Sequence, residues 1–408
     1  MDRVQAFFAT EPGYVVLLFT LLVLPRLVVR WRLPTAITAF GLGALAGLGF
    51  DLFAEDQTVH LLSTFGIVAL FLFAGLDVDA ADLARRTKVL VQHLVIRVLL
   101  LAVATVALAR WLDLAVRPAV LVALALLTPS TGFILDSLRG FGLSAEERLW
   151  VRSKAIATEL LALTVLFVVL QSASWPRLAL ATLALIALVA MLPAVFRFFA
   201  ARVAPYAPTS EFAFLLMMAV LCAYATRRLG VYYLVGAFVV GVAGRRFRTR
   251  LPAMASEQML HAIEVFASFF IPFYFFSAGT SLRRGEFTVA ALVLGVAFVG
   301  LAVPLRIASI ALHRRLALGE RLAESIRVAT PLMPTLVFTL VIVGILRERY
   351  ELPAWILGAL VIYTVVNTLV PGFALGLPAP AFDAPGLPAQ TGDEPPAVSP
   401  AAGSSRPP

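Results

Sequence analysis

The sequence predicts an all-α polytopic membrane protein with about thirteen transmembrane helices. Hydrophobic residues make up 61% of the chain and charged residues only 14%, and the mean hydropathy is +0.94. Apolar runs of about 20 residues recur along the chain between short Arg-bearing loops, and each run is long enough to cross a bilayer as a helix. Because the bilayer interior offers no water to backbone groups, helices are the spanning element that this pattern allows.

The predicted spans follow one another closely, so no soluble domain of useful size is expected. They cover residues 13–30, 33–50, 60–77, 88–110, 117–138, 148–171, 176–199, 209–228, 230–245, 261–282, 287–312, 325–346 and 352–375. The first run lacks a small-residue cleavage site and is predicted to be a retained helix. Residues 1–375 are expected to form one transmembrane domain, and the Pro/Ala-rich residues 376–408 a disordered cytoplasmic tail.

Basic residues set the expected orientation. With the N-terminus outside, the inner loops hold roughly twice as many Arg and Lys residues as the outer loops, which predicts a cytoplasmic C-terminus. Lys154 and Arg314 are expected in inner loops, and His313 is expected in a loop as well. The expected location is the plasma (inner) membrane, within the lipid bilayer. The net charge of +9 therefore indicates topology, and no nucleic-acid partner is expected.

Internal similarity predicts an inverted-topology repeat, with halves at about residues 33–200 and 209–375. Three matches carry it: Thr128-Pro129 with Thr330-Pro331, Ala74-Gly75 with Ala278-Gly279, and Glu159 with Asn367. Each pair lies seven predicted spans apart. Since seven is odd, the second copy enters the membrane from the opposite side, and such a repeat is typical of secondary transporters.

Glu159 is the acidic residue nearest the centre of a predicted span. A carboxylate at that depth costs several kcal/mol unless a partner or water compensates it. It either braces the helix bundle, paired or protonated, or forms a proton or cation site, and the second reading is favoured.

Two predicted spans are interrupted by proline. Proline removes a backbone donor and frees carbonyl groups in the preceding turn, and such breaks occur at membrane depth where they line a cavity or are packed in protein. Oxygen ligands from such breaks suit a hard cation. Together with Glu159, the expected proton- and cation-binding residues are Thr158, Thr128, Ser130 and Thr131, and the expected helix breaks lie at Pro129, Thr330, Pro331, Pro334 and Thr335.

Arg306 is the other costly residue inside a span. Its side chain either extends to the inner interface or forms an ion pair with Glu159 that a bound cation breaks. Arg97 and His93 share one helical face at a spacing of four residues.

Enzymatic activity is not expected. The chain has no HExxH, GxSxG or glycine-rich phosphate loop. Its single cysteine, Cys222, excludes a multi-cysteine metal site. No cofactor is expected, and no metal beyond a transported Na⁺ or K⁺.

Three stretches resemble the monovalent cation:proton antiporters of the Kef-type sodium/hydrogen exchanger group. They are 70–77 (LFLFAGLD), similar to the family's FLAGLE; 236–241 (GAFVVG), similar to GAFLAGL; and 269–282 (FFIPFYFFSAGTSL), similar to FFPLFFVSVGM. The resemblance implies a thirteen-helix fold with two crossed broken helices, a core domain and a dimerisation domain. It also implies a homodimer and elevator-type alternating access.

The chain departs from this family at two positions. Thr158-Glu159 stands where Asn-Asp, Asp-Asp or Gln-Asp is usual, and Arg306 stands where many members have lysine. Because arginine does not deprotonate in proteins, Glu159 is expected to be the sole carrier of the transported proton. One carboxylate implies electroneutral exchange of one cation for one proton.

Three functions therefore compete. The favoured one is cation:proton antiport at Glu159. A second keeps the fold but transports an organic anion held by Arg306, or a sodium-coupled solute. The third is a non-transporting membrane sensor or assembly partner.

Overall fold

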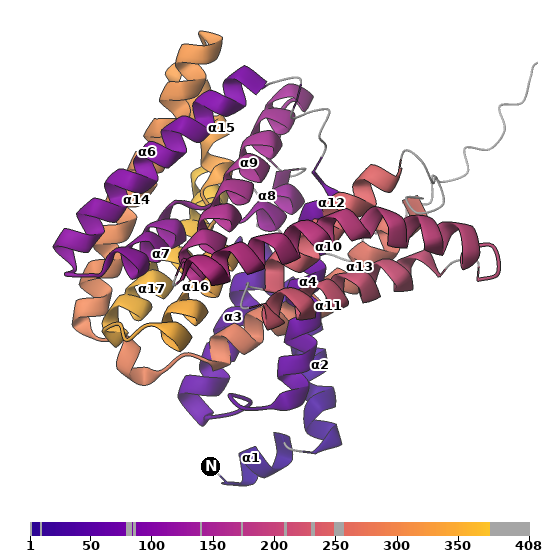
Figure 1. The fold of residues 1–408 in the computed structure, drawn as a ribbon. Helices are drawn as coiled ribbons and strands as arrows, with labels where there is room; N and C mark the ends of the chain where they lie inside the picture. Colours follow the sequence, from indigo (N-terminus) through magenta and orange to yellow (C-terminus); the bar gives the residue numbers. More distant parts are fainter. Residues whose placement is uncertain are drawn as a thin grey trace, which may run out of the picture.

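The protein is helical throughout the part of the chain that the computed structural model describes, residues 2–8, 10–78, 84, 87–138, 141–172, 174–207, 210–229, 233–248 and 257–375 (Figure 1). The helices are α1 (Asp2–Phe8), α2 (Glu11–Val28), α3 (Thr35–Ala44), α4 (Gln57–Leu76), α6 (Thr87–Trp111), α7 (Val116–Leu127), α8 (Thr131–Ser137), α9 (Ala145–Gln171), α10 (Trp175–Arg202), α11 (Glu211–Arg228), α12 (Tyr233–Arg248), α13 (Glu257–Thr280), α14 (Val289–Leu318), α15 (Leu322–Ala329), α16 (Leu336–Arg349) and α17 (Ala354–Leu375). Four short turns complete them: η1 (Val29–Trp31), η2 (Leu45–Gly49), η5 (Arg284–Glu286) and η6 (Thr330–Leu332).

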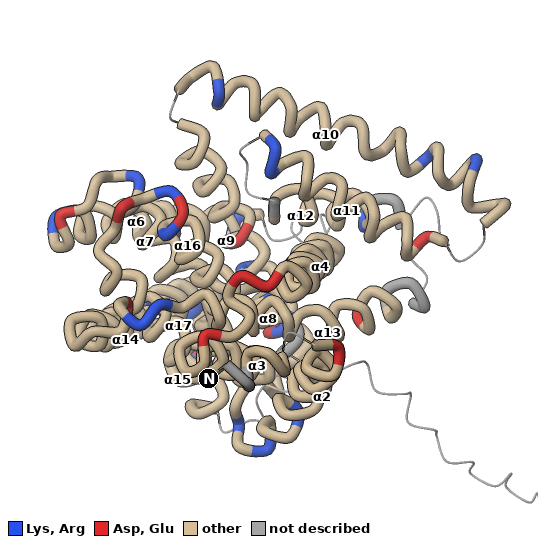
Figure 2. Tube along the Cα trace, turned by 90° about the horizontal axis from the view of Figure 1, so that it is seen from below, with Lys and Arg blue, Asp and Glu red and all other residues tan. Residues whose placement is uncertain are grey.

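The prediction of an all-α polytopic membrane protein is confirmed. Within the described residues, nine helices are long and apolar enough to span a bilayer, or ten if the bent pair α15–α16 counts as one span. Two shorter apolar helices, Thr35–Gly49 and Leu234–Arg245, also coincide with predicted spans. The count of thirteen stays a prediction. The expected tail, 376–408, lies outside the described residues. Charged residues lie mostly at helix ends and in connections (Figure 2).

The helices form two bundles (Figure 1). One, the scaffold bundle, contains α2, α3, α4, α11, α12 and α13. The other, the crossover bundle, contains α6 to α9 and α14 to α17. Each bundle combines helices from both predicted halves of the chain. The long helix α10 runs along the outside and connects the two bundles (Figure 2).

Glycines set the closest helix contacts of the scaffold bundle. A Cβ atom on Gly75 of α4 would overlap the backbone of α12 at Phe238 and Gly241, and one on Gly279 of α13 would overlap α3 at Phe40 and Gly43. Small residues let membrane helices approach this closely. The two contacts are equivalent under the predicted repeat, since α4 corresponds to α13 and α12 to α3. The motif glycines therefore mark symmetric helix crossings.

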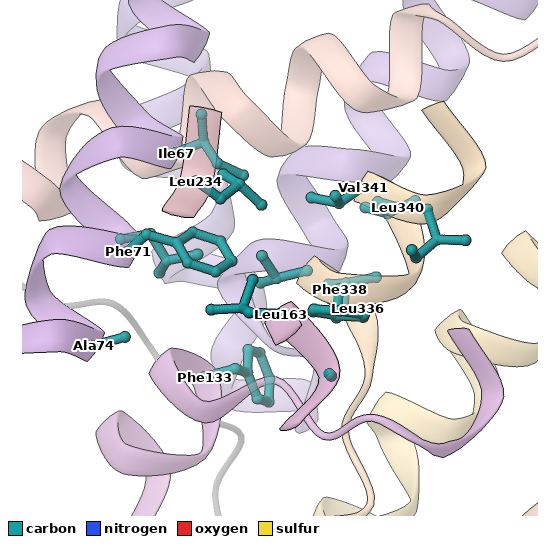
Figure 3. Close-up of a cluster of buried hydrophobic side chains, with 14 of the residues drawn as sticks. Ile67, Phe71, Ala74, Phe133, Leu163, Leu234, Leu336, Phe338, Leu340 and Val341 are labelled. Carbon is teal, nitrogen blue, oxygen red and sulfur yellow. The ribbon is translucent and has the colours of Figure 1, made fainter. Parts of the chain in front are cut away.

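The two bundles meet across an apolar surface. Ile67, Phe71 and Ala74 of α4 lie opposite Phe133 of α8 and Leu163 of α9 (Figure 3). Residues Leu336 to Val341 of α16 border the same cluster (Figure 3). The polar contact at one end of this surface joins Arg152 of α9 to the carbonyl (2.6 Å) and carboxylate (3.0 Å) oxygens of Asp77.

Replacing Gly75 by alanine should destabilise the fold. The added methyl group would force α4 and α12 apart, and overpacking of this kind costs about 1–3 kcal/mol. Gly41→Ala on α3 is the matched control, because no atom lies within 4 Å of the position its Cβ would take. Thermal melting of both variants in detergent, followed by size-exclusion chromatography, measures the difference. Equal melting temperatures would contradict the tight α4–α12 contact.

Candidate functional site

Two broken helices cross inside the crossover bundle. The first break separates α7 from α8 at Thr128–Ser130, where Thr128 is extended (φ −88°, ψ 121°). This conformation follows from Pro129, since a proline disfavours the α region for the residue before it. The second break lies between α15 with η6 and α16, which bend by 48°. The expected breaks at Pro129, Thr330, Pro331, Pro334 and Thr335 all fall at these two places.

The two breaks hydrogen-bond directly to each other. The backbone N–H of Ser130 donates to the carbonyl of Pro334 (2.8 Å). The Ser130 hydroxyl oxygen accepts from the backbone N–H groups of Val337 (3.0 Å) and Phe338 (3.3 Å), the free donors at the start of α16. Ser130 thus caps the other broken helix, a role that uses the oxygen expected to bind a cation.

The carbonyl groups at the end of α7 accept hydrogen bonds from side chains in the second half of the chain. The Thr339 hydroxyl donates to the carbonyl of Ala125 (2.8 Å), and the Tyr363 hydroxyl to that of Leu126 (2.6 Å). Such partners replace water, since unsatisfied carbonyls inside a membrane protein cost several kcal/mol.

Arg306 satisfies the free carbonyl groups at the second break. Its guanidinium donates to the carbonyls of Leu332 (2.7 Å) and Met333 (2.8 Å) and to the Tyr363 hydroxyl (3.1 Å). The Asn367 amide also donates to Met333 (2.6 Å). Arg306 is fully buried, so its side chain does not extend to the inner interface. The ion pair with Glu159 is not present. The positive group instead neutralises the carbonyl end of a broken helix.

Glu159 lies beside the first break. Its helix, α9, starts at a capping box in which Ser144 and Glu147 satisfy each other's backbone donors. Glu159 is 4% exposed, and its carboxyl group faces the hydroxyl and the backbone N–H of Thr131 at the start of α8. The Oε2 atom of Glu159 and the Oγ1 atom of Thr131 are buried without a hydrogen-bond partner. A carboxylate oxygen and a hydroxyl oxygen are therefore free together at the crossing.

Thr158, expected as a ligand, is engaged elsewhere. Its hydroxyl donates to the carbonyl of Lys154 (2.8 Å) and lies 2.9 Å from Nε2 of His93. With its proton donated to Lys154, the hydroxyl accepts the Nε2–H of His93. Thr158 thus faces α6 rather than the crossing, and its expected role in binding the cation stays a prediction.

The remaining expected residues divide into two sets. Thr128 is buried at the first break beside Ser130 and Thr131. The Thr330 hydroxyl bonds to the carbonyl of Ile326 in its own helix (2.8 Å). The Thr335 hydroxyl lies 2.9 Å from that of Thr364 and accepts from the Asn367 amide (3.3 Å). The structure therefore brings Thr131 to Glu159, and it uses Thr330 and Thr335 within the second break.

Sequence reasoning missed several groups. Together with Asn367, which the sequence pairs with Glu159, the residues Tyr363, Thr364 and Thr368 form a polar stripe on the otherwise apolar helix α17, and that spacing was the available signal. Lys154, His313 and Arg314, expected in loops, are buried within α9 and α14. In the described part of the chain, no three His, Cys, Asp or Glu side chains gather to hold a metal ion.

Crossed broken helices from two inverted halves, with one buried carboxylate beside them, define a secondary membrane transporter. Residues 15–379 match the family described as "Sodium/hydrogen exchanger, transmembrane", and the chain belongs to this family. No curated protein sequence is similar enough to count as a match. Among solved structures, the fold is similar to that of the sodium proton antiporter MjNhaP1 from Methanocaldococcus jannaschii at pH 8. The TM-score is 0.64 at 14% identity, over 88% of this chain and 97% of that chain.

Arg306→Gln should lower the free energy of unfolding in detergent by about 2–4 kcal/mol, because two buried carbonyls lose a charged donor. Combined with Glu159→Gln, the losses should add, with a coupling energy below about 0.5 kcal/mol, since the two side chains share no contact. Chemical unfolding of the two single variants and the double variant measures this. A larger coupling energy would indicate a direct ion pair.

Proposed function

We propose that the protein exchanges a monovalent cation, Na⁺ or K⁺, for a proton across the membrane, with Glu159 as the shared binding site. The observation that carries the proposal is the pair of buried, unpartnered oxygens, Oε2 of Glu159 and Oγ1 of Thr131. Membership of the sodium/hydrogen exchanger family and the likeness to a sodium proton antiporter support it.

One carboxylate makes the exchange one-for-one. When Glu159 is ionised, a cation lies between its carboxylate, the Thr131 hydroxyl and oxygens of the first break near Thr128. When the cation leaves, a proton replaces it on the carboxyl group. Both loaded forms carry the same charge, so the exchange is electroneutral. Arg306 remains protonated throughout and stays bonded to Leu332 and Met333.

Alternating access arises from an elevator movement of the crossover bundle along the scaffold bundle. The apolar surface between them favours sliding, because few directional bonds must be broken (Figure 3). The pair Arg152–Asp77 holds the arrangement seen here at one end of that surface. We further propose a homodimer formed through the scaffold bundle. The chain would lie in the plasma membrane with its N-terminus outside and its C-terminus in the cytoplasm.

The organic-anion alternative is weaker. An anion would need the Arg306 guanidinium, whose Nη atoms donate to two carbonyls and a hydroxyl of the protein. Releasing these donors would leave the second break unsatisfied.

Glu159→Gln should abolish cation:proton exchange and leave the fold intact, since glutamine keeps the shape but neither ionises nor carries a proton. The assay uses proteoliposomes with an internal pH dye, to which Na⁺ or K⁺ is added with and without an imposed membrane potential. Wild-type protein should show a pH change that is independent of the potential.

Glu351→Gln, at an exposed carboxylate, is the matched control and should transport normally. Exchange at the wild-type rate by Glu159→Gln would show that Glu159 is not the proton- and cation-binding residue. Dependence of the wild-type rate on the potential would exclude one-for-one exchange. No flux of either cation by well-folded wild-type protein would favour an anion carrier or a sensor.

Cross-linking the two bundles should stop exchange. A Cβ atom on Gly132 of α8 would lie 3.2 Å from Leu70 of α4, so Leu70→Cys with Gly132→Cys brings two thiols together in a Cys222→Ala background. Oxidation should block transport, and reductant should restore it. Each single-cysteine variant is a control. Undiminished exchange by protein that mass spectrometry shows to be cross-linked would contradict the elevator movement.

A further inference from the structure

A buried amine and a buried imidazole lie in contact away from the crossing. Lys154 of α9 is 1% exposed, and its Nζ atom lies 2.5 Å from Nδ1 of His313 on α14. The same Nζ atom lies 3.9 Å from the ring centroid of Trp150. Among the described residues, Lys154 forms no ion pair with a carboxylate. A lone buried ammonium is costly, so its partner must be able to share its charge.

The hydrogen bonds around His313 fix which nitrogen accepts. Its Nε2 atom lies 3.4 Å from the Oε1 atom of Gln92, which can only accept, so Nε2 carries a hydrogen. In the neutral ring, Nδ1 is then the acceptor that faces Lys154. The two nitrogens can therefore hold one proton between them, as an ammonium donating to imidazole or as an imidazolium donating to an amine.

The surroundings of this pair are basic. His93 and Arg97 of α6 face it, and the His93 ring stacks on that of His313 at 6.2 Å. Arg314 is close enough to repel the charge of Lys154 and lies 4.7 Å from the Trp150 ring centroid, but its own charge is matched by Glu320 (2.6 and 2.7 Å). From α15, Arg327 pairs with Glu147 of α9. Arg117 of α7 donates a hydrogen bond to the carbonyl of Ser172, at the opposite end of α9 from the pair. The pair therefore releases its proton without leaving an unpaired negative charge.

We propose that Lys154 and His313 form a second proton-binding site, distinct from Glu159, and that its charge controls how tightly the crossing binds a cation. In the protonated form, one proton is shared between Nζ and Nδ1. Deprotonation gives that proton to water and leaves a neutral amine beside a neutral imidazole. No proton passes from the pair to the opposite side of the membrane, so the pair changes cation affinity and leaves the stoichiometry unchanged.

The connection to the crossing runs through Thr158. Its hydroxyl donates to the carbonyl of Lys154 and accepts from His93, and the next residue is Glu159. A positive charge on Lys154, five residues before Glu159 in α9, opposes a second positive charge at the carboxylate. Loss of that charge strengthens cation binding at the Glu159 carboxylate.

The fluorescence of Trp150 gives a direct readout of the protonation state of Lys154, whose Nζ atom lies over its ring. A cation on an indole face is bound through the ring quadrupole, so loss of the ammonium charge changes the surroundings of the chromophore. The emission of Trp150, taken as the difference between a protein and its Trp150→Phe variant, should titrate with pH in a Glu159→Gln background that cannot transport. The titration should vanish in both Lys154→Met and His313→Gln.

Matched controls exist for both residues. Lys88, the other lysine of the chain, and His60 are exposed, so Lys88→Met and His60→Gln should keep the titration. A Trp150 titration that persists in both Lys154→Met and His313→Gln would overturn the proposed proton site, as would an emission difference that does not change with pH in otherwise folded protein. The second substitution keeps the test valid if the first does not fold.

The coupling to Glu159 rests on the proposed antiport and has its own test in proteoliposomes. Where the pH lies within the titration range of the pair and below that of Glu159, the wild-type apparent cation affinity should fall as the pH falls, with a slope approaching about two protons per cation. Lys154→Met should reduce this slope to about one, by removing one of the two competing protons. Equal slopes would overturn the coupling. The fluorescence titration does not depend on transport, so failure of the antiport proposal would leave the proton site standing.

Discussion

The crossing of the two broken helices depends on one constraint, which is that its backbone groups must be hydrogen-bonded without water. Each break frees carbonyls at the end of one helix and N–H groups at the start of the next. The structure satisfies them reciprocally, with Ser130 of the first half capping α16 and Thr339 of the second half bonding to Ala125. Neither half completes all of its own helix ends, since α16 depends on Ser130 and α7 depends on Thr339.

That constraint also explains which charged group is left for an ion. Arg306 is held by Leu332, Met333 and Tyr363, where its charge balances the carbonyl end of a broken helix. Had it paired with Glu159, the carbonyls would need another donor and the carboxylate would be neutralised in place. Because Arg306 is engaged by backbone, Glu159 keeps an oxygen free. The fold thus separates the charge that stabilises the crossing from the charge proposed to bind the transported ion.

Much of the fold could be predicted from the sequence, because hydropathy, proline and glycine act locally. The helix breaks, the paired motif glycines and the burial of Glu159 all follow from short stretches. The partners of Ser130 and Arg306 could not be predicted, since spacing along the chain does not say which carbonyl a buried donor meets. The burial of Lys154 and His313 could not be predicted for a different reason. The helices α9 and α14 extend beyond their most apolar residues, and there both pack against α6 and meet each other at Lys154 and His313.

Each half of the chain contributes one broken helix, but the two halves carry different side chains at one position that the predicted repeat makes equivalent. Under the predicted repeat, Glu159 of α9 corresponds to Asn367 of α17, and both are buried. An amide can donate, and that of Asn367 bonds to the carbonyl of Met333 and the hydroxyl of Thr335. An ionised carboxylate accepts only, so it cannot serve the carbonyls of a broken helix. The second half therefore uses this position to complete the crossing, whereas the first half leaves its carboxylate beside Thr131. The predicted repeat makes the two positions equivalent, and the carboxylate in the first half is the group that we propose to bind a proton or a cation.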